Sequence, residues 1–304
     1  MSFLNADKVA AAYVNFNAKM NTALEDLRKP DAFWRMLATE VASSAKIEQH
    51  DWLGPVPGFT EWVGERKIGK VAASNYQITN KKWASGLEVD QDDLEDDRLG
   101  IYAPKIQTMV EKAMVHRLNL MVDFMVNGFA TTKYGGAYDG AAFFSSRSGL
   151  FNNKATATLD DAGAYDAAWV AMLAVKDEDG EPMGVFQGDN VWLIVGPSNR
   201  ATARALLLAE RNANGSTNTN FGTAKLYISP KLVGGDAAKW FLVDLSHPIK
   251  PLIFQSRREI AFRAPNGPDS HEKFMKDKLY FGADARYNVG FGLPQTAYGS
   301  DGTT

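Results

Sequence analysis

The sequence contains no cysteine among its 304 residues. This absence excludes disulfide bonds, thiolate nucleophiles and zinc sites built on sulfur ligands. A chain without disulfides also fits folding and assembly in a reducing cytoplasm.

Long hydrophobic runs are missing too. No stretch approaches the ~20 apolar residues that cross a bilayer. The first residues, Met1–Ala12, include Asp7 and Lys8 and have no apolar core of a secretory signal. We therefore expect a soluble protein without a membrane partner.

Neither sign of charge is in large excess. The formal net charge is −3 and the sequence pI is about 5.9, whereas a strong nucleic-acid binder usually carries a basic stripe or tail. The apolar content of 45% and the charged content of 23% are ordinary for a globular protein. The length suits one large domain or two modest ones with a sizeable core.

Recognisable catalytic motifs are absent from the sequence. It has neither the GxSxG motif of serine hydrolases nor the HExxH motif of zinc proteases, and it lacks GxGxxG and GxxxxGK[ST]. The histidines, at positions 50, 116, 247 and 271, have no ligand spacing. We therefore predict no enzyme activity and no catalytic, cofactor-binding or metal-binding residues.

The N-terminal part of the sequence has a helical periodicity. Apolar residues recur every three or four positions between Val9 and Leu27, which predicts an amphipathic helix that docks on its own domain or on a neighbour. A second helix is expected over residues 30–43. Its inward-facing residues are Phe33, Trp34, Leu37 and Val41.

Between Phe59 and Asp90 the period changes to two. Apolar residues such as Ile78 and Leu87 alternate with polar ones, which predicts two strands of a hairpin that is polar on both faces over much of its length. Basic residues lie near its ends: Arg66, Lys67, Lys70, Lys81 and Lys82. An isolated two-stranded ribbon is marginal in water, so we expect something outside the ribbon to hold it.

A cluster of carboxylates precedes the longest helical pattern. Its members include Asp90, Asp92, Asp93, Glu95, Asp96 and Asp97. Acidic residues favour the positive end of a helix dipole, so a solvated helix entry is preferred over a cation site, for which the spacing of a calcium loop is missing. The helix itself is predicted over residues 104–127, with Met109, Met121 and Met125 on its apolar face and Arg117 away from it.

The second half of the chain alternates between helices and strands. A nearly continuous apolar run predicts a buried strand at Val191–Val195, and Ser198 is the expected cap of the next helix. Helices are predicted over 160–175 and 199–210, strands over 226–229, 240–244 and 252–254, a flexible tip over 212–220, and a strand pair over 274–291.

Four short blocks resemble the major head subunit of Mu-like phages, the gpT family. They are Trp52–Gly54 with Glu61–Arg66, Asp93–Pro104, Pro251–Arg257 and Phe281–Gly292. The blocks follow the family's order and span residues 52–292. The resemblance implies an α+β chain with the Hong Kong 97-like phage capsid fold.

The resemblance also implies the organisation of the chain. The expected parts are an N-terminal arm with helices (1–52), an extended hairpin loop (53–90), a peripheral domain with a long spine helix (91–150 and 252–292), an axial domain (151–251) and a C-terminal tail (293–304).

A function follows from the resemblance. It implies the major capsid protein of a tailed double-stranded DNA phage or prophage, assembled in the host cytoplasm into the pentamers and hexamers of an icosahedral virion shell. Its expected partners are copies of itself, a portal, a decoration protein and a separate scaffolding protein, because the arm begins almost at Met1. The shell would enclose DNA without sequence-specific binding.

Contacts between copies are expected to be electrostatic. We predict that Arg66, Lys67, Lys70, Lys81 and Lys82 of one subunit face Asp92, Asp93, Glu95, Asp96 and Asp97 of a neighbour. The main alternative is an encapsulin-like nanocompartment shell of the same fold. A soluble enzyme with an unrecognised site is a less favoured alternative.

Overall fold

The computed structural model describes residues 33–53, 75–90, 99–159, 162–177, 180–263 and 278–304. Residue contacts divide the chain into two units. The first contains residues 80–118 and 256–287 with the chain up to Trp34, and the second contains residues 35–79, 119–255 and 288–304. The predicted helix over residues 9–27 lies outside the described residues.

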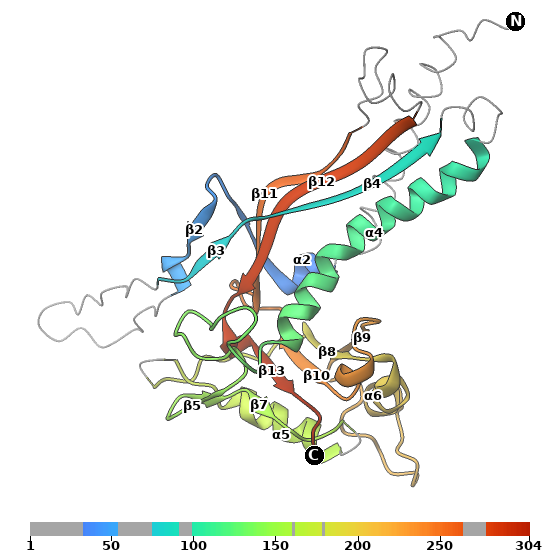
Figure 1. The fold of residues 1–304 in the computed structure, drawn as a ribbon. Helices are drawn as coiled ribbons and strands as arrows, with labels where there is room; N and C mark the ends of the chain where they lie inside the picture. Colours follow the sequence, from blue (N-terminus) through green and yellow to red (C-terminus); the bar gives the residue numbers. More distant parts are fainter. Residues whose placement is uncertain (1–32, 54–74, 91–98, 160–161, 178–179, 264–277) are drawn as a thin grey trace, which may run out of the picture. The chain divides into compact units, whose positions relative to one another are not determined.

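A four-stranded sheet has the strand order β1-β11-β12-β4. Its strands are β1 (Ala38–Ala42), β4 (Lys81–Asp90), β11 (Leu252–Arg263) and β12 (Lys278–Phe291). β4 pairs antiparallel with β12 along its whole length, from Asp90 opposite Lys278 to Lys81 opposite Tyr287. Among the described strands β4 therefore lies at the edge of the sheet, and in Figure 1 helix α4 runs beside it.

The predicted long helix is confirmed as α4 (Leu99–Val126), which begins five residues earlier than expected. Met121 and Met125 of its apolar face are fully buried. Arg117, which we expected away from that face, is only 4% exposed. That expectation is wrong because a partner distant in sequence neutralises the arginine, as described below.

The hairpin predicted between Phe59 and Asp90 is wrong in its pairing. Both strands exist, but β3 (Gln77–Thr79) pairs with β2 (Ile47–Gln49), and β4 pairs with β12. In the described part of this segment, the strands are therefore held by other strands of the same chain. Alternation identifies a strand, but it does not identify the strand's partner.

Two further strand predictions need correction. β11 continues from Leu252 to Arg263, well beyond the predicted 252–254. Its charged residues are exposed, and three of them, Arg258, Glu259 and Arg263, form ion pairs. The described part of the predicted pair over 274–291 is one strand, β12. Gly290 allows close approach within this strand: a Cβ on Gly290 would lie 2.3 Å from Cδ1 of Ile78.

The second predicted helix is shorter than expected. α2 covers Phe33–Leu37, and the chain then enters β1. Phe33, Trp34 and Leu37 are buried, as predicted, whereas Val41 is half-buried in the strand. The β-branched residues Thr39 and Val41 favour the extended backbone over a continued helix.

The second unit contains a five-stranded sheet with the order β7-β13-β10-β8-β9. The strands are β7 (Lys154–Ala155), β8 (Val191–Val195), β9 (Lys225–Ile228), β10 (Trp240–Asp244) and β13 (Ala297–Ser300). β8 and β10 match their predictions, and β9 differs by one residue at each end. β8 pairs parallel with β9 and antiparallel with β10, so a neighbouring strand flanks each of its edges.

Two helices pack with this sheet, α5 (Ala162–Leu173) and α6 (Arg200–Leu208). Both were predicted, but Ser198 does not cap α6. A 3₁₀ turn, η2 (Pro197–Asn199), precedes the helix, and its cap residue Asn199 makes no side-chain capping bond. The core between helices and sheet is built on large buried residues, among them Trp240, Tyr165 and Phe186.

The remaining elements are short. They are β5 (Ser146–Arg147), β6 (Phe151–Asn152), and the 3₁₀ turns η1 (Asp51–Leu53), η3 (Gly234–Asp236) and η4 (Pro294–Thr296). Within the described ranges, the chain has no helix that combines the length and the apolar content needed to cross a bilayer.

Candidate assembly surfaces

Lys81 and Lys82 are the predicted contact residues that the structure describes. They begin β4, and both are exposed. Adjacent residues of a strand point to opposite faces, so the two amines lie on opposite faces of the sheet. The other predicted contact residues lie outside the described residues: Arg66, Lys67, Lys70, Asp92, Asp93, Glu95, Asp96 and Asp97.

A pocket of about 270 Å³ lies in the first unit, next to these lysines. Its lining comes from β4, α4, β11 and β12. Small residues such as Ala113, Ala283 and Ala285 leave the space open, and aromatic rings form one end of it. The lining residues are Trp83, Ala84, Ser85, Met109, Lys112, Ala113, His116, Ile260, Ala283, Asp284, Ala285 and Tyr287.

Three rings define the aromatic end of the pocket. His116 Nδ1 lies 2.7 Å from the hydroxyl of Tyr287, and the indole nitrogen of Trp83 donates a 3.0 Å hydrogen bond to the Tyr287 carbonyl. The Trp83 and His116 ring centroids are 4.4 Å apart. Burial lowers the pKa of His116 and raises the pKa of Tyr287 to about 12, so both side chains are neutral near pH 7.

Arg117 contacts the ring of Tyr287, one of the lining residues of the pocket. It pairs with Glu259 of β11, and its guanidinium carbon lies 5.0 Å from the Trp34 ring centroid and 5.6 Å from that of Tyr287. A buried cation needs such a partner and is stabilised further by aromatic faces. Arg117, Glu259 and Tyr287 could not be recognised as a group from the sequence, because they come from distant positions without a shared motif.

The second unit exposes apolar side chains on its helices. Val170 of α5 is 67% exposed, and Leu208, which ends α6, is 49% exposed. Phe221 lies near Leu208, since the amide of Gly222 donates to the carbonyl of Leu207, and it is also 49% exposed. The predicted flexible tip is tied down at this place: the buried Asn218 donates to three carbonyls at the end of α6, those of Ala205, Leu206 and Ala209.

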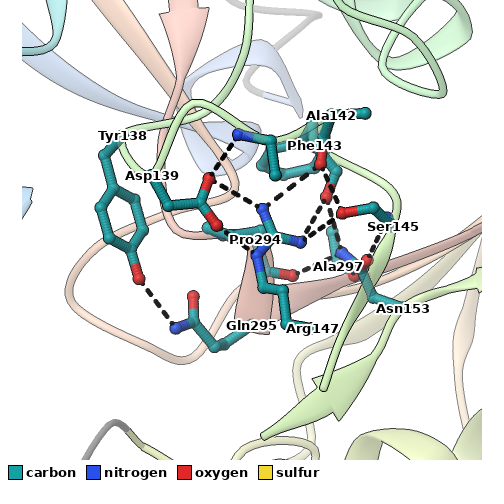
Figure 2. Close-up of polar contacts among 11 residues, drawn as sticks. Tyr138, Asp139, Ala142, Phe143, Ser145, Arg147, Asn153, Pro294, Gln295 and Ala297 are labelled. Carbon is teal, nitrogen blue, oxygen red and sulfur yellow. Dashed lines mark hydrogen bonds and ion pairs between the residues drawn. The ribbon is translucent and has the colours of Figure 1, made fainter.

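Figure 2 shows a polar network that anchors a loop of the second unit. The Arg147 guanidinium donates to Asp139, with Nε 2.6 Å from Oδ2. The fully buried Asn153 accepts from the amide of Ser145 at 2.9 Å. Its amide group points to three backbone carbonyls, those of Phe143, Pro294 and Ala297. These bonds join the loop to η4 and the start of β13, so the network is structural.

A buried histidine fixes the strands β2 and β3. His50 Nε2 lies 2.9 Å from Oε1 of Gln255, and the Gln255 amide donates to the Ile78 carbonyl at 3.1 Å. Since the Gln255 oxygen must then accept, His50 carries a proton on Nε2. In the part of the chain that the structure describes, no three His, Asp or Glu residues gather as a metal site.

Comparison with known proteins identifies the family. The family model of the Mu-like prophage major head subunit gpT matches residues 9–159, 150–232 and 229–304. This chain belongs to that family. It is 27% identical over 303 residues to the Mu-like prophage FluMu major head subunit of Haemophilus influenzae. The aligned region covers 99% of this chain and 76% of the relative. The chain is also 27% identical over 264 residues to the major capsid protein of Escherichia phage Mu, covering 87% and 65% of the two chains.

Solved capsid structures resemble the head subunit as well. A chain of the bacteriophage JBD30 procapsid matches with a TM-score of 0.57 and 26% identity, over 98% of this chain and 76% of that one. A virus-like particle from Pyrococcus furiosus shares the fold alone, with a TM-score of 0.54 and 13% identity over 93% and 98%. The predicted Hong Kong 97-like α+β fold is confirmed.

The family also decides the function. The head subunit is a major capsid protein of a Mu-like phage or prophage, and it is part of the virion. Its family is structural, and its role is to assemble into a capsid shell with other phage proteins. The nanocompartment alternative is not favoured, since both relatives are phage head proteins.

Proposed function

We propose that this head subunit forms pentamers and hexamers that close into an icosahedral shell around double-stranded DNA, which it encloses without sequence-specific binding. The observation that carries this proposal is the likeness to a procapsid chain over 98% of the sequence. The net charge of −3 supports loose enclosure, because tight DNA binding needs many phosphate contacts from Lys and Arg.

The parts of the chain suit distinct tasks in such a shell. We assign the peripheral domain to residues 91–150 and 252–292 together with β1, which lies in the four-stranded sheet, and the arm to the rest of residues 1–52. We assign the axial domain to 151–251 together with residues 293–304, because β13 lies within the five-stranded sheet. Within the predicted loop over 53–90, β4 is continuous with the long sheet, so we assign β4 to the peripheral domain. The extended loop then consists of the residues before Asn80.

We propose that the basic residues Arg66, Lys67, Lys70, Lys81 and Lys82 contact the acidic cluster Asp92, Asp93, Glu95, Asp96 and Asp97 of a neighbouring copy. A surface ion pair contributes ~1 kcal/mol or less. Many copies of such pairs around a closed shell add up, and they also set the orientation of neighbours. The exposure of Lys81 and Lys82 supports this contact.

Charge reversal tests the contact. In the variant with Lys67, Lys70, Lys81 and Lys82 changed to Glu, we expect no shells by electron microscopy, because attraction becomes repulsion. The free energy of unfolding should change little, since the described lysines are exposed. The control reverses two exposed cations of the second unit, Lys176→Glu with Arg200→Glu, and should still assemble. Normal shells from the lysine variant would refute the contact.

We further propose three partners that assembly requires: a separate scaffolding protein, a portal and a decoration protein. The JBD30 capsid is decorated with minor capsid protein trimers, which supports the last of these. Electron microscopy of the subunit expressed with and without the phage's scaffolding protein tests the proposal. We expect closed, uniform shells only with the scaffold, and uniform shells without it would remove the need for one.

A further inference from the structure

We infer that the pocket in the first unit receives Leu94 from a second copy of this chain. The inference rests on the proposed contact between basic and acidic residues, and it gives that contact an apolar centre. Three observations carry it: the size and lining of the pocket, its charge, and the reach of the chain.

The pocket suits an aliphatic side chain. A cavity of ~150 Å³ lined by apolar groups holds a molecule of benzene size, so about 270 Å³ accepts a leucine side chain together with part of its backbone. Much of the lining is apolar: Met109 and Ile260 line the pocket with the alanines, and the rings of Trp83 and Tyr287 add aromatic surface.

The charged groups in and next to the pocket are mostly basic. The lining holds one amine, Lys112, and one carboxylate, Asp284. Asp284 is already paired with two arginines, Arg258 and Arg263, whereas Lys112 is exposed. Lys81 adds a further positive charge, because it lies two residues before Trp83 and therefore on the same face of β4.

One segment of the sequence complements this pocket. Between Asp90 and Asp97, Leu94 is the single apolar residue, and acidic residues flank it on both sides: Asp92, Asp93, Glu95, Asp96 and Asp97. A leucine would pack against the apolar lining while its acidic neighbours approach the basic groups. Apolar burial supplies affinity, and charge complementarity supplies orientation.

The chain's own Leu94 cannot reach the aromatic end of the pocket. Trp83 lies seven residues before Asp90 in β4, which is ~23 Å at 3.3 Å per residue. Ala113 lies fourteen residues after Leu99 in α4, which is ~21 Å. Four extended residues from Asp90 to Leu94 span at most ~14 Å, and five from Leu94 to Leu99 at most ~18 Å. Ser85 and Met109 are nearer, ~17 Å from Asp90 along β4 and ~15 Å from Leu99 along α4, so the chain's own leucine can reach the end of the pocket that they line. A leucine seated against the aromatic rings comes from another copy.

Disulfide trapping tests the pairing, because the natural chain has no cysteine and each variant carries one thiol. Subunits with Leu94→Cys are assembled together with subunits carrying Ala113→Cys, and the particles are mildly oxidised. We expect a covalent dimer on a denaturing gel. The control is Val115→Cys, which lies two residues further along α4, about 200° around the helix, and is 43% exposed. It should give no dimer with Leu94→Cys.

The outcomes separate the inference from the proposed function. Particles in which Leu94→Cys links to neither position, or links equally to both, would overturn the pocket contact and leave shell assembly standing. Failure of the unaltered chain to form particles with its scaffold would remove both.

A peptide measurement covers variants that do not assemble. A fluorescent peptide of residues 89–98 should bind the unassembled subunit, and the same peptide with Leu94→Ser should bind about tenfold more weakly, because its charge is kept and only the apolar anchor is lost. Equal binding of the two peptides would refute the role of Leu94.

Discussion

Single residues stabilise this head subunit by satisfying backbone groups that its loops leave buried. Asn153 is the clearest case, because one fully buried carboxamide serves the amide of Ser145 and three carbonyls. A buried polar group without a partner costs about 1–3 kcal/mol. One side chain therefore determines whether the loop of Figure 2 can pack.

Asn153→Asp should lower the free energy of unfolding by about 3 kcal/mol or more, because a donor becomes an acceptor that faces three carbonyls. Urea denaturation measures the loss. The neighbour Asn152→Asp is the control: Asn152 is exposed and its Oδ1 accepts from the Lys154 amide, a role that aspartate keeps. Similar losses in both variants would contradict this account of Asn153.

His116 gives the subunit a dependence on pH. Its pKa is lowered by burial, so the unfolded chain binds the proton more readily than the folded one. Stability should then rise with pH between the lowered folded pKa and the ordinary value of 6.5, and fall as acid is added below 6.5. In His116→Gln the loss of unfolding free energy between about pH 7.5 and about pH 5.5 should be smaller than in the natural chain. Equal losses would show that other groups cause the dependence.

At the scale of elements, close approach between backbones decides where helices and strands can join. Gly196 connects β8 to η2 and α6, and a Cβ at this position would lie 2.3 Å from the carbonyl oxygen of Leu232. Backbone atoms cannot move aside as a flexible side chain does. The turn therefore requires glycine.

Gly196→Ala should destabilise the subunit by about 2 kcal/mol or more, through a shift of the strand-to-helix connection. Thermal unfolding monitored by circular dichroism measures the change. Gly235→Ala provides the matched control, because a Cβ there would meet no atom within 4 Å, and its midpoint should stay near that of the natural chain. A stable Gly196→Ala variant would mean that the connection can relax.

At the scale of the whole molecule, the sequence predicted elements better than their partners. Val191–Val195 and Trp240–Asp244 were identified because continuous apolar runs mark covered strands. The pairing of β4 with β12 was not predicted, because alternation is a local signal and the partner strand lies nearly 200 positions away in the sequence.

The same distance limits what could be predicted of the candidate site. Lys81 and Lys82 were predicted as contact residues from local sequence alone, and the structure shows that both are exposed. The pocket beside them depends on Trp83, His116 and Tyr287, which only the folded sheet and helix bring together. Arg117 was misplaced for a related reason: its partner Glu259 lies 142 positions further along the chain.

The position of β4 at the edge of the described strands has a consequence for the time before a shell exists. A strand at the edge of a sheet can pair with other chains, which leads to aggregation and fibril growth. Four of the ten residues of β4 are charged, namely Lys81, Lys82, Glu88 and Asp90. Such residues act as gatekeepers. They should keep newly synthesised subunits soluble until these subunits assemble with their correct neighbours.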